Sequence, residues 1–306
     1  MMNNFKQVIE YSRKIGPKTI AVAAAEDADV LGAVNHAYKE GIANAVLIGN
    51  REKILQIMEA NHLNKDSFEI VDEKDKTKAC HKAVQLIKTG EASLIMKGLV
   101  DTSEILKAIL HKETGLNIEG LLSHVGVLKI DKYDRFFIIS DSAMNIYPTL
   151  EDKVHIINNA VAVAHALGNK NPKVAVLCSV EKVNEKILST VHAAELVRMN
   201  LEGSIKGCIV GGPFALDNAV SPEAAEHKGI DHPVAGKADI LITPNLEAGN
   251  ILNKAIEYFS VAEKAGVVVG AKSPIILTSR ASSMSAKLNS IALAVLISKN
   301  TVQDLS

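Results

Sequence analysis

The sequence predicts an α/β protein with mainly parallel sheets. Short apolar runs alternate along the chain with amphipathic helical stretches, and Gly, Pro, Ser or Thr closes the runs. This alternation is typical of parallel βαβ units in a sheet that helices cover. The chain has 306 residues, of which 47% are apolar. It can therefore build an ample core, and its length favours about two domains.

The predicted elements follow from the pattern of each segment. The strands expected from apolar runs are, in order, TIAVAAA, AVLIG, FEIVD, LIMKG, KVAVLCS, GCIVGGP, ADILITP and IILTS. The helices expected from amphipathic stretches are 27–40, 149–167, 180–200, 250–265 and 283–298. The second helix has Thr149 and Asp152 at the spacing of a capping box, which marks its start.

One segment, residues 121–139, contains two strand-like runs around a polar turn, with no helix between them. It predicts a β-hairpin or a strand pair that crosses between domains. We expect residues 1–128 in a first α/β domain and residues 129–272 in a second domain inserted into it. We expect residues 273–306, with their apolar final helix, to return to the first domain, which leaves a cleft between the two.

Charge and composition exclude several classes of function. A formal net charge of −1 provides no global field for nucleic acid or an anionic membrane. The chain has no apolar stretch of about 18 residues, and its first residues lack the apolar core of a signal peptide, so we expect a cytoplasmic protein. Three distant cysteines and ten scattered histidines show no disulfide or metal-ligand spacing. We therefore expect reduced core cysteines and no metal.

Two distant segments share one construction, in which an apolar strand runs into a cation and hydroxyl groups before a helix. They are SLIMKGLVDTSEIL at 93–106 and PIILTSRASSMSAKL at 274–288. Backbone N–H groups, a helix N-terminus and a fixed positive charge are how proteins hold phosphate without a metal. Both turns are therefore predicted oxyanion sites. If they face one cleft, the ligand is a phosphorylated or multiply anionic small molecule.

Each turn also has an ordinary structural interpretation. Ser279 and Arg280 put a hydroxyl and a planar donor fork at the end of a strand, where α/β sheets bind ligands, but Arg280 could equally form a surface ion pair. Lys97 would supply a point charge, and Gly98 would let backbone approach a ligand, unless this is a common βα loop. The alternative caps of the following helix are Thr102 and Ser103.

The predicted second domain contributes two loops and two candidates for proton transfer. The candidate loop residues are Gly212, Pro213, Asn245, Gly249 and Asn250, although Gly and Asn also suit any turn. His124 lies in a strand-like context, and Asp141 opens DSAMNIYP after another apolar run. Either could serve as a base if it reaches the cleft.

Several segments, in this order, resemble the phosphate acetyl/butyryltransferase family. They are MKGLVDTSEILKAIL, SHVGVLKI, SDSAMNIYPTLEDK, GGPFALDNAVS, VAGKADILITPNLEAGNILNKA and PIILTSRASS. SHVGV and the spacing through SDSAMNIYP and LTSRASS look more like the butyryl branch than the acetyl branch. The resemblance covers essentially the whole chain. It implies a two-domain fold similar to isocitrate and isopropylmalate dehydrogenases, a homodimer or larger homo-oligomer, and an active site between the domains.

The resemblance implies a reaction and a set of residues. The reaction converts an acyl-CoA and inorganic phosphate reversibly into an acyl phosphate and CoA, with no tightly bound cofactor. Ser279 and Arg280 match the family's Ser-Arg pair. The acetyl branch has an arginine where this chain has Lys107, and an aspartate base where it has Ala286. The missing carboxylate leaves His124 and Asp141 as candidates for the proton role, and Asn145 lies in the same matching segment as Asp141.

The expected mechanism is direct attack of phosphate on the thioester in a ternary complex. Arg280 would hold phosphate, Ser279 would donate to the carbonyl oxygen or sulfur, and Lys97 would neutralise developing charge. A serine nucleophile is the weaker alternative because G-x-S-x-G is absent. Butyryl is the expected acyl group. The alternatives are acetyl transfer within the same family and a non-catalytic sensor of CoA or acyl phosphate.

Overall fold

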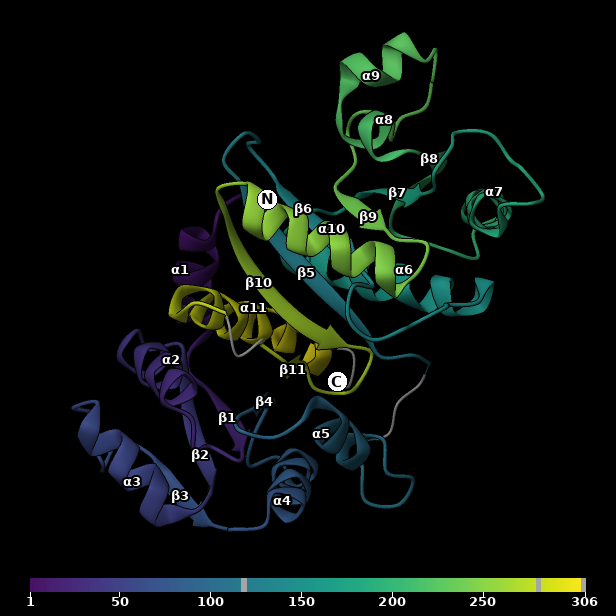
Figure 1. Cartoon of the computed structure of the whole chain (residues 1–306). Helices are drawn as coiled ribbons and strands as arrows, with labels where there is room; N and C mark the ends of the chain where they lie inside the picture. Colours follow the sequence, from purple (N-terminus) through teal and green to yellow (C-terminus); the bar gives the residue numbers. More distant parts are fainter. Residues whose placement is uncertain (117–119, 279–281, 304–306) are drawn as a thin grey trace. The chain divides into compact units, whose positions relative to one another are not determined.

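The computed structural model describes residues 1–116, 120–278 and 282–303. The chain divides into two compact units (Figure 1). The flanking unit contains Phe5–Glu119 and Ala265–Ser306, and the inserted unit contains Met1–Asn4 and Gly120–Lys264. The chain thus changes unit near residues 119 and 264, whereas the sequence suggested 128 and 272. A boundary at 128 would cut a strand that pairs with the next strand of the inserted unit.

The flanking unit has the strand order β3-β2-β1-β4-β11-β10. The strands are β1 (Lys18–Ala23), β2 (Ala43–Gly49), β3 (Glu69–Asp72), β4 (Leu94–Lys97), β11 (Ile275–Ile276) and β10 (Ala262–Val269), which begins in the inserted unit. Neighbours among β3, β2, β1, β4 and β11 are parallel, and β10 is antiparallel to β11. Ile20, Val22, Ile95 and Met96 are fully buried, as expected for central parallel strands.

Short polar side chains set the starts of several helices in the flanking unit. The helices are α1 (Phe5–Ile15), α2 (Ala28–Lys39), α3 (Arg51–Ala60), α4 (Lys76–Thr89), α5 (Thr102–Ile109) and α11 (Met284–Gln303). Asp27, Asn50 and Asp75 each accept a hydrogen bond from the backbone N–H three residues later, which caps α2, α3 and α4. The apolar helix α11 packs against α1 and α2.

The inserted unit has the strand order β5-β6-β9-β7-β8. The strands are β5 (Ser123–Ile130), β6 (Phe136–Ser140), β9 (Ile240–Ile242), β7 (Lys173–Leu177) and β8 (Ile209–Phe214). β5 and β6 are antiparallel, which confirms the predicted strand pair, and β6, β9, β7 and β8 are parallel. The carboxyl ends of these four strands therefore lie at one edge of the sheet.

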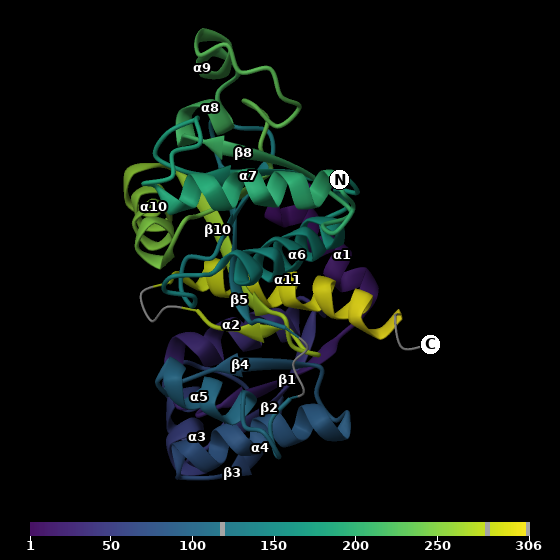
Figure 2. The same cartoon turned by 90° about the vertical axis from the view of Figure 1, so that its right-hand side faces the viewer.

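Helices of the inserted unit begin mostly at this same edge. They are α6 (Leu150–Ala166), α7 (Leu188–Leu201), α8 (Leu216–Val220), α9 (Pro222–His227) and α10 (Leu246–Phe259). Thr149 and Asp152 form the predicted capping box of α6. α6 packs on β5, β6 and β9, and it lies beside α7, which packs on β7 and β8 (Figure 2).

The fold class is confirmed as α/β with mainly parallel strands, but the bounds of two expected helices were wrong in part and one strand was missed. The helix expected over 180–200 begins only at Leu188, because the preceding loop is held by hydrogen bonds between Asn184 and Thr190. The helix expected over 250–265 covers 246–259, since Asn245 caps it. Residues 262–269 then form β10, which was not predicted as a strand.

Candidate active site

Two parallel strands of the flanking unit end side by side at the predicted oxyanion turns. β11 pairs with β4 through Ile275 with Ile95 and Ile276 with Met96. The next residue of β4 is Lys97, and the Thr278 turn follows β11. The two turns therefore leave the sheet at one edge, although they are far apart in the sequence. Carboxyl ends of parallel strands are the usual ligand-binding edge of such sheets.

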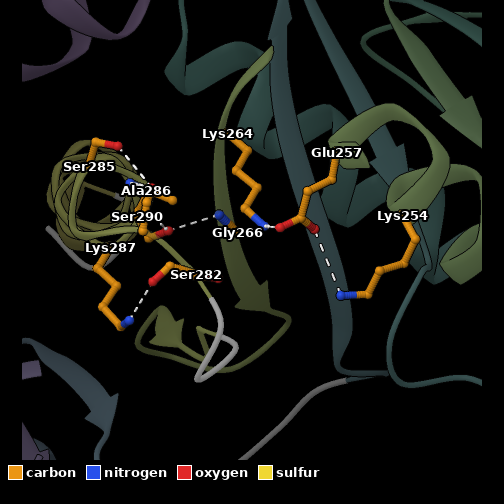
Figure 3. Close-up of polar contacts among 10 residues, drawn as sticks. Lys254, Glu257, Lys264, Gly266, Ser282, Ser285, Ala286, Lys287 and Ser290 are labelled. Atoms are coloured by element: carbon orange, nitrogen blue, oxygen red, sulfur yellow. Dashed lines mark hydrogen bonds and ion pairs between the residues drawn. The ribbon is translucent and has the colours of Figure 1, made fainter. Parts of the chain in front are cut away.

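Ser279 and Arg280 lie outside the described residues, whereas the end of their turn is described from Ser282. Ser283 Oγ accepts a hydrogen bond from the Ala286 N–H at 3.2 Å, at the start of α11. Lys287 is only 2% exposed. Its Nζ donates to the Ser282 carbonyl at 2.6 Å (Figure 3). The same atom lies 3.6 Å from the Asp29 carboxylate on α2. Lys287 therefore ties the end of the turn to α2.

Lys97 and Gly98 have local roles that the sequence did not reveal. Lys97 is 7% exposed, and its Nζ donates to the Val100 carbonyl at 3.1 Å and to the Gly98 carbonyl at 3.4 Å. Its charge thus also stabilises its own loop. A Cβ on Gly98 would lie 2.9 Å from the Ala23 carbonyl oxygen and closer still to that of Ala24. Glycine is required at this position because the backbone at the end of β1 packs directly against it. This requirement does not depend on a ligand.

The helix after this loop begins differently from the expectation. Asp101 occupies the N-cap position of α5, and its carbonyl accepts from the N–H of Glu104. Thr102 and Ser103, the predicted caps, lie instead in the first helical turn and are exposed. Lys107 forms an exposed ion pair with Glu104 at 2.8 Å, and this hydrogen bond raises the pKa of Lys107. Lys107 therefore lies at the protein surface, and its charge is paired with Glu104.

Several predicted residues of the inserted unit converge on one polar cluster at the carboxyl ends of β6 and β9. His124, on β5, places Nδ1 3.1 Å from the Ser142 hydroxyl. Burial lowers the pKa of His124, Asp141 acts in the opposite direction, and Lys264 lowers it further. The imidazole is therefore mainly neutral at neutral pH. Lys264 is itself ion-paired with Glu257 (Figure 3).

The Asp141 carboxylate is almost completely engaged by its own loop. Oδ1 accepts from the N–H groups of Ala143 at 2.8 Å and Met144 at 3.1 Å. Oδ2 accepts from the Asn145 N–H at 3.2 Å and from its side-chain amide at 2.5 Å. Asn145 also donates to the Leu122 carbonyl at 3.0 Å, which joins this loop to β5. Asp141 is 3% exposed, so it holds the loop that carries Ser142.

The start of α10 closes on the same loop. Asn245 Oδ1 caps α10 through the Ala248 N–H at 2.9 Å, and Asn250 donates to the Ser142 carbonyl at 3.2 Å. A Cβ on Gly249 would lie 2.7 Å from Thr243 Oγ1 and closer still to the Asp141 carbonyl oxygen. Gly249 is thus required by close packing.

The remaining predicted loop residues, Gly212 and Pro213, lie within β8, and β9 and β7 separate that strand from β6. They do not join the cluster around His124. Sequence reasoning missed Ser142 and Thr243, both of which bind parts of this cluster. Their only signal was position, because Ser142 follows the predicted run that ends at Ile139 and Thr243 lies at the end of the predicted strand ADILITP.

Within the ranges that the structure describes, no three or more His, Cys, Asp or Glu side chains gather in a way that could hold a metal ion. None of the described helices combines the length and apolar character that a bilayer span needs. Apart from the Asp141 carboxylate, which its own loop engages, the polar side chains that converge at the two places are cations, hydroxyls, amides and an imidazole. Such groups suit anionic, hydrogen-bonding ligands.

Comparison with known proteins gives consistent results. The sequence pattern of the phosphate acetyl/butaryl transferase family matches residues 4–82 and 73–295. Phosphate butyryltransferase of Clostridium beijerinckii is 48% identical over 297 residues, which cover 97% of this chain and 98% of that protein. Phosphate acetyltransferase of Thermotoga maritima is 45% identical over 289 residues, which cover 94% of this chain and 98% of that protein.

Solved structures show the same relationship. A branched-chain phosphotransacylase from Enterococcus faecalis matches with a TM-score of 0.81 and 32% identity, over 92% of this chain and 99% of that one. A 4-hydroxythreonine-4-phosphate dehydrogenase from Klebsiella pneumoniae matches with a TM-score of 0.55 at 13% identity, over 92% of this chain and 99% of that one. The second likeness concerns the fold alone, and it agrees with the dehydrogenase-like fold that the resemblance implied.

Proposed function

The chain belongs to the phosphate acetyl/butaryl transferase family, and we propose that it moves a short acyl group, butyryl in preference, reversibly between CoA and inorganic phosphate. The observation that carries this proposal is the parallel pairing of β11 with β4. Because the two strands are parallel, Lys97 and Thr278 both follow strand ends at one edge of the sheet, and Ser279 and Arg280 come directly after Thr278 in the sequence. Two neighbouring cationic turns suit a reaction in which both substrates and both products are anions.

The proposed mechanism is direct attack of phosphate on the thioester carbonyl. The C–S bond breaks as the new C–O bond forms, and the thiolate leaves and takes up a proton. Arg280 holds the phosphate as a planar donor fork, and Ser279 donates to the carbonyl oxygen or sulfur. Lys97 and the start of α5 add positive potential. Alignment of the reactants supplies most of the acceleration, so a covalent acyl-enzyme is unnecessary.

His124 is the proposed proton carrier. In the reverse direction CoA must lose its thiol proton before it attacks the acyl phosphate. The lowered pKa of His124 keeps the imidazole neutral and able to accept that proton. Its contact with Ser142 at 3.1 Å supports a fixed ring orientation. The carboxylate of Asp141 is less suitable, because backbone and amide N–H groups occupy both of its oxygens.

An assay of CoA release from acetyl-, propionyl-, butyryl- and isobutyryl-CoA in phosphate buffer tests the function. We expect the highest kcat/KM with a four-carbon acyl group and a dependence on phosphate concentration. One methylene changes binding by only about 1–3 kcal/mol, so neighbouring chain lengths should also react. The highest value with acetyl-CoA would favour the acetyltransferase alternative, which the 45% identity to an acetyltransferase keeps open. Absence of phosphate-dependent CoA release from every donor would refute the proposal.

We also propose that the protein is a homo-oligomer that uses α10. Within the described residues, Gly249 is the only fully buried residue of this helix, and Leu252 and Ile256 are partly buried against the core. Its apolar side chains Ile251, Tyr258 and Phe259 are 68%, 68% and 89% exposed, and Val261 directly beyond it is 73% exposed. Contiguous exposed apolar side chains are typical of association surfaces.

A further inference from the structure

A second polar cluster lies at the carboxyl end of β7 in the inserted unit. It contains Lys153 in the first turns of α6, Cys178 directly after β7, and Ser189 and His192 on α7. Lys153 and Ser189 both act on Cys178, and Lys153 contacts His192. β7 is parallel to β9, and β9 is parallel to β6. This cluster therefore lies at the same sheet edge as the His124 cluster, one strand beyond β9.

Lys153 has a buried amine with no carboxylate partner among its described surroundings. The residue is 2% exposed, and its Nζ lies 3.2 Å from His192 Nδ1. Burial lowers the pKa of Lys153, and burial together with Lys153 lowers that of His192, so the imidazole is a neutral acceptor. An ammonium group has three donors. Across residues 1–116, 120–278 and 282–303, no carboxylate is among the groups that act on Lys153.

The N-terminus of α7 offers further donors at this place. α7 has 14 residues, and Ile187 occupies its N-cap position with no side-chain hydrogen bond. α6 and α10, by contrast, are capped by Thr149 and Asn245. The Thr190 N–H of the first turn donates to the Ile187 carbonyl, so the donors that remain for a ligand are the N–H groups of Leu188 and Ser189. The first turn also carries positive potential. The Ser189 hydroxyl lies in that turn and interacts with the thiol of Cys178.

We propose that Lys153, Ser189 and the start of α7 bind a phosphoryl anion. A buried ammonium that lacks a counter-charge is unfavourable, and an anion at this place would offset that cost. A phosphoryl group has several acceptor oxygens, which suit the free Lys153 donors, a hydroxyl and helix N–H groups together. The proposed function suggests two sources for it, the phosphates of the CoA nucleotide and a second inorganic phosphate ion. The inference rests on the proposed function only for this choice of ligand.

Steady-state kinetics of Lys153→Met with two acyl donors distinguishes the sources. Methionine retains the bulk and removes the amine, and Lys206→Met removes an exposed lysine of the same unit as a matched control. If the CoA nucleotide supplies the anion, Lys153→Met should raise KM for butyryl-CoA about 10-fold or more and leave KM for butyryl-pantetheine unchanged. If inorganic phosphate binds there, KM for phosphate should rise with both donors. Ser189→Ala should give a smaller change with the same donor dependence.

Thermal unfolding gives a second measurement that does not need turnover. Inorganic phosphate, CoA and pantetheine are each added to wild-type protein, Lys153→Met and Lys206→Met. We expect the anion that binds at Lys153 to raise the melting temperature of wild type and Lys206→Met more than that of Lys153→Met. Equal shifts in all three proteins with unchanged KM values would overturn the site. If Lys153→Met does not fold, the ligand-induced shifts in melting temperature of Ser189→Ala are compared with those of wild type instead, and equal shifts would overturn the site. A wild-type protein that binds CoA but never releases it from butyryl-CoA would instead remove the proposed function.

Discussion

At the scale of single residues, His124 and Asp141 differ in their freedom to exchange protons. Both were candidates from the sequence, and both lie in one cluster. Asp141 accepts four hydrogen bonds from its own loop, so protonation would break contacts that fix Ser142. Among the described residues, the imidazole of His124 has one hydrogen-bond partner, Ser142 through Nδ1, while its backbone carbonyl accepts from the Ser140 hydroxyl. A proton acceptor needs a free lone pair, which favours His124 for chemistry and Asp141 for positioning.

The first prediction concerns the pH dependence of the reverse reaction, in which butyryl phosphate and CoA react. His124 must be unprotonated to act as the base. Its pKa lies below the ordinary value of about 6.5 because it is buried. Activity should therefore be flat around neutral pH and decline as the pH falls through that lowered pKa. The measurement is kcat/KM for CoA from pH 5 to pH 8.

His124→Gln removes the titrating group and should lower kcat about 100-fold or more. It should also abolish the decline at acidic pH, which a purely structural defect would not do. His227→Gln is the matched control, since His227 ends α9 elsewhere in the inserted unit. An unchanged acidic limb in His124→Gln would contradict the proposed role.

The second prediction concerns Asp141→Asn, which keeps the shape of the side chain and replaces an acceptor oxygen by a donor amide. That amide would face the N–H groups of Ala143 and Met144, or those of Asn145. A buried donor without an acceptor costs about 1–3 kcal/mol. Urea denaturation should show this loss in the free energy of unfolding. Asp231→Asn, at an exposed position of the same unit, should have the same free energy of unfolding as wild type. A free energy of unfolding for Asp141→Asn equal to that of wild type would disprove the positioning role.

At the scale of elements, the sequence predicted what local chemistry determines. The capping box of Thr149 and Asp152 marked the start of α6 correctly, because its hydrogen bonds span only three residues. β10 was missed because its first residues, AEKAG, continue the helical pattern of α10, whereas pairing with β11 is a tertiary contact. The convergence of Asn145, Asn245 and Asn250 was likewise unpredictable. It depends on β6 lying beside β9, which no local pattern encodes.

The third prediction tests how closely α10 packs on the Asp141 loop. Gly249→Ala would place its Cβ 2.7 Å from Thr243 Oγ1 and closer to backbone. Because backbone cannot yield cheaply, we expect a loss of about 1–3 kcal/mol in unfolding free energy. Gly126→Ala is the matched control, because its Cβ would have no neighbour nearer than 3.7 Å. Similar stability of the two variants would show that the loop adapts and that the contact is not restrictive.

At the scale of the whole molecule, α10 has two different sides. Its first turn closes on the Asp141 loop, and Leu252 and Ile256 pack against the core of the unit. Its other side carries the exposed side chains Ile251, Tyr258 and Phe259. From the sequence, a homo-oligomer was expected only through the family resemblance. The exposure of apolar side chains on α10 depends on tertiary structure and could not be read from the sequence. Any surface that covers α10 would restrain the same helix whose start binds the Ser142 carbonyl. Association and activity are therefore expected to be coupled.

The fourth prediction follows from that coupling. Phe259→Asp places a charge where an 89% exposed aromatic ring now lies, and burial of an unpaired charge in an interface is strongly unfavourable. Light scattering after size-exclusion chromatography should show a lower molar mass for this variant than for wild type, together with a lower kcat. Leu201→Asp is the matched control, because Leu201 is 82% exposed at the end of α7. If α10 is the interface, only Phe259→Asp should change the mass, and a wild-type mass equal to that of one chain would exclude the oligomer.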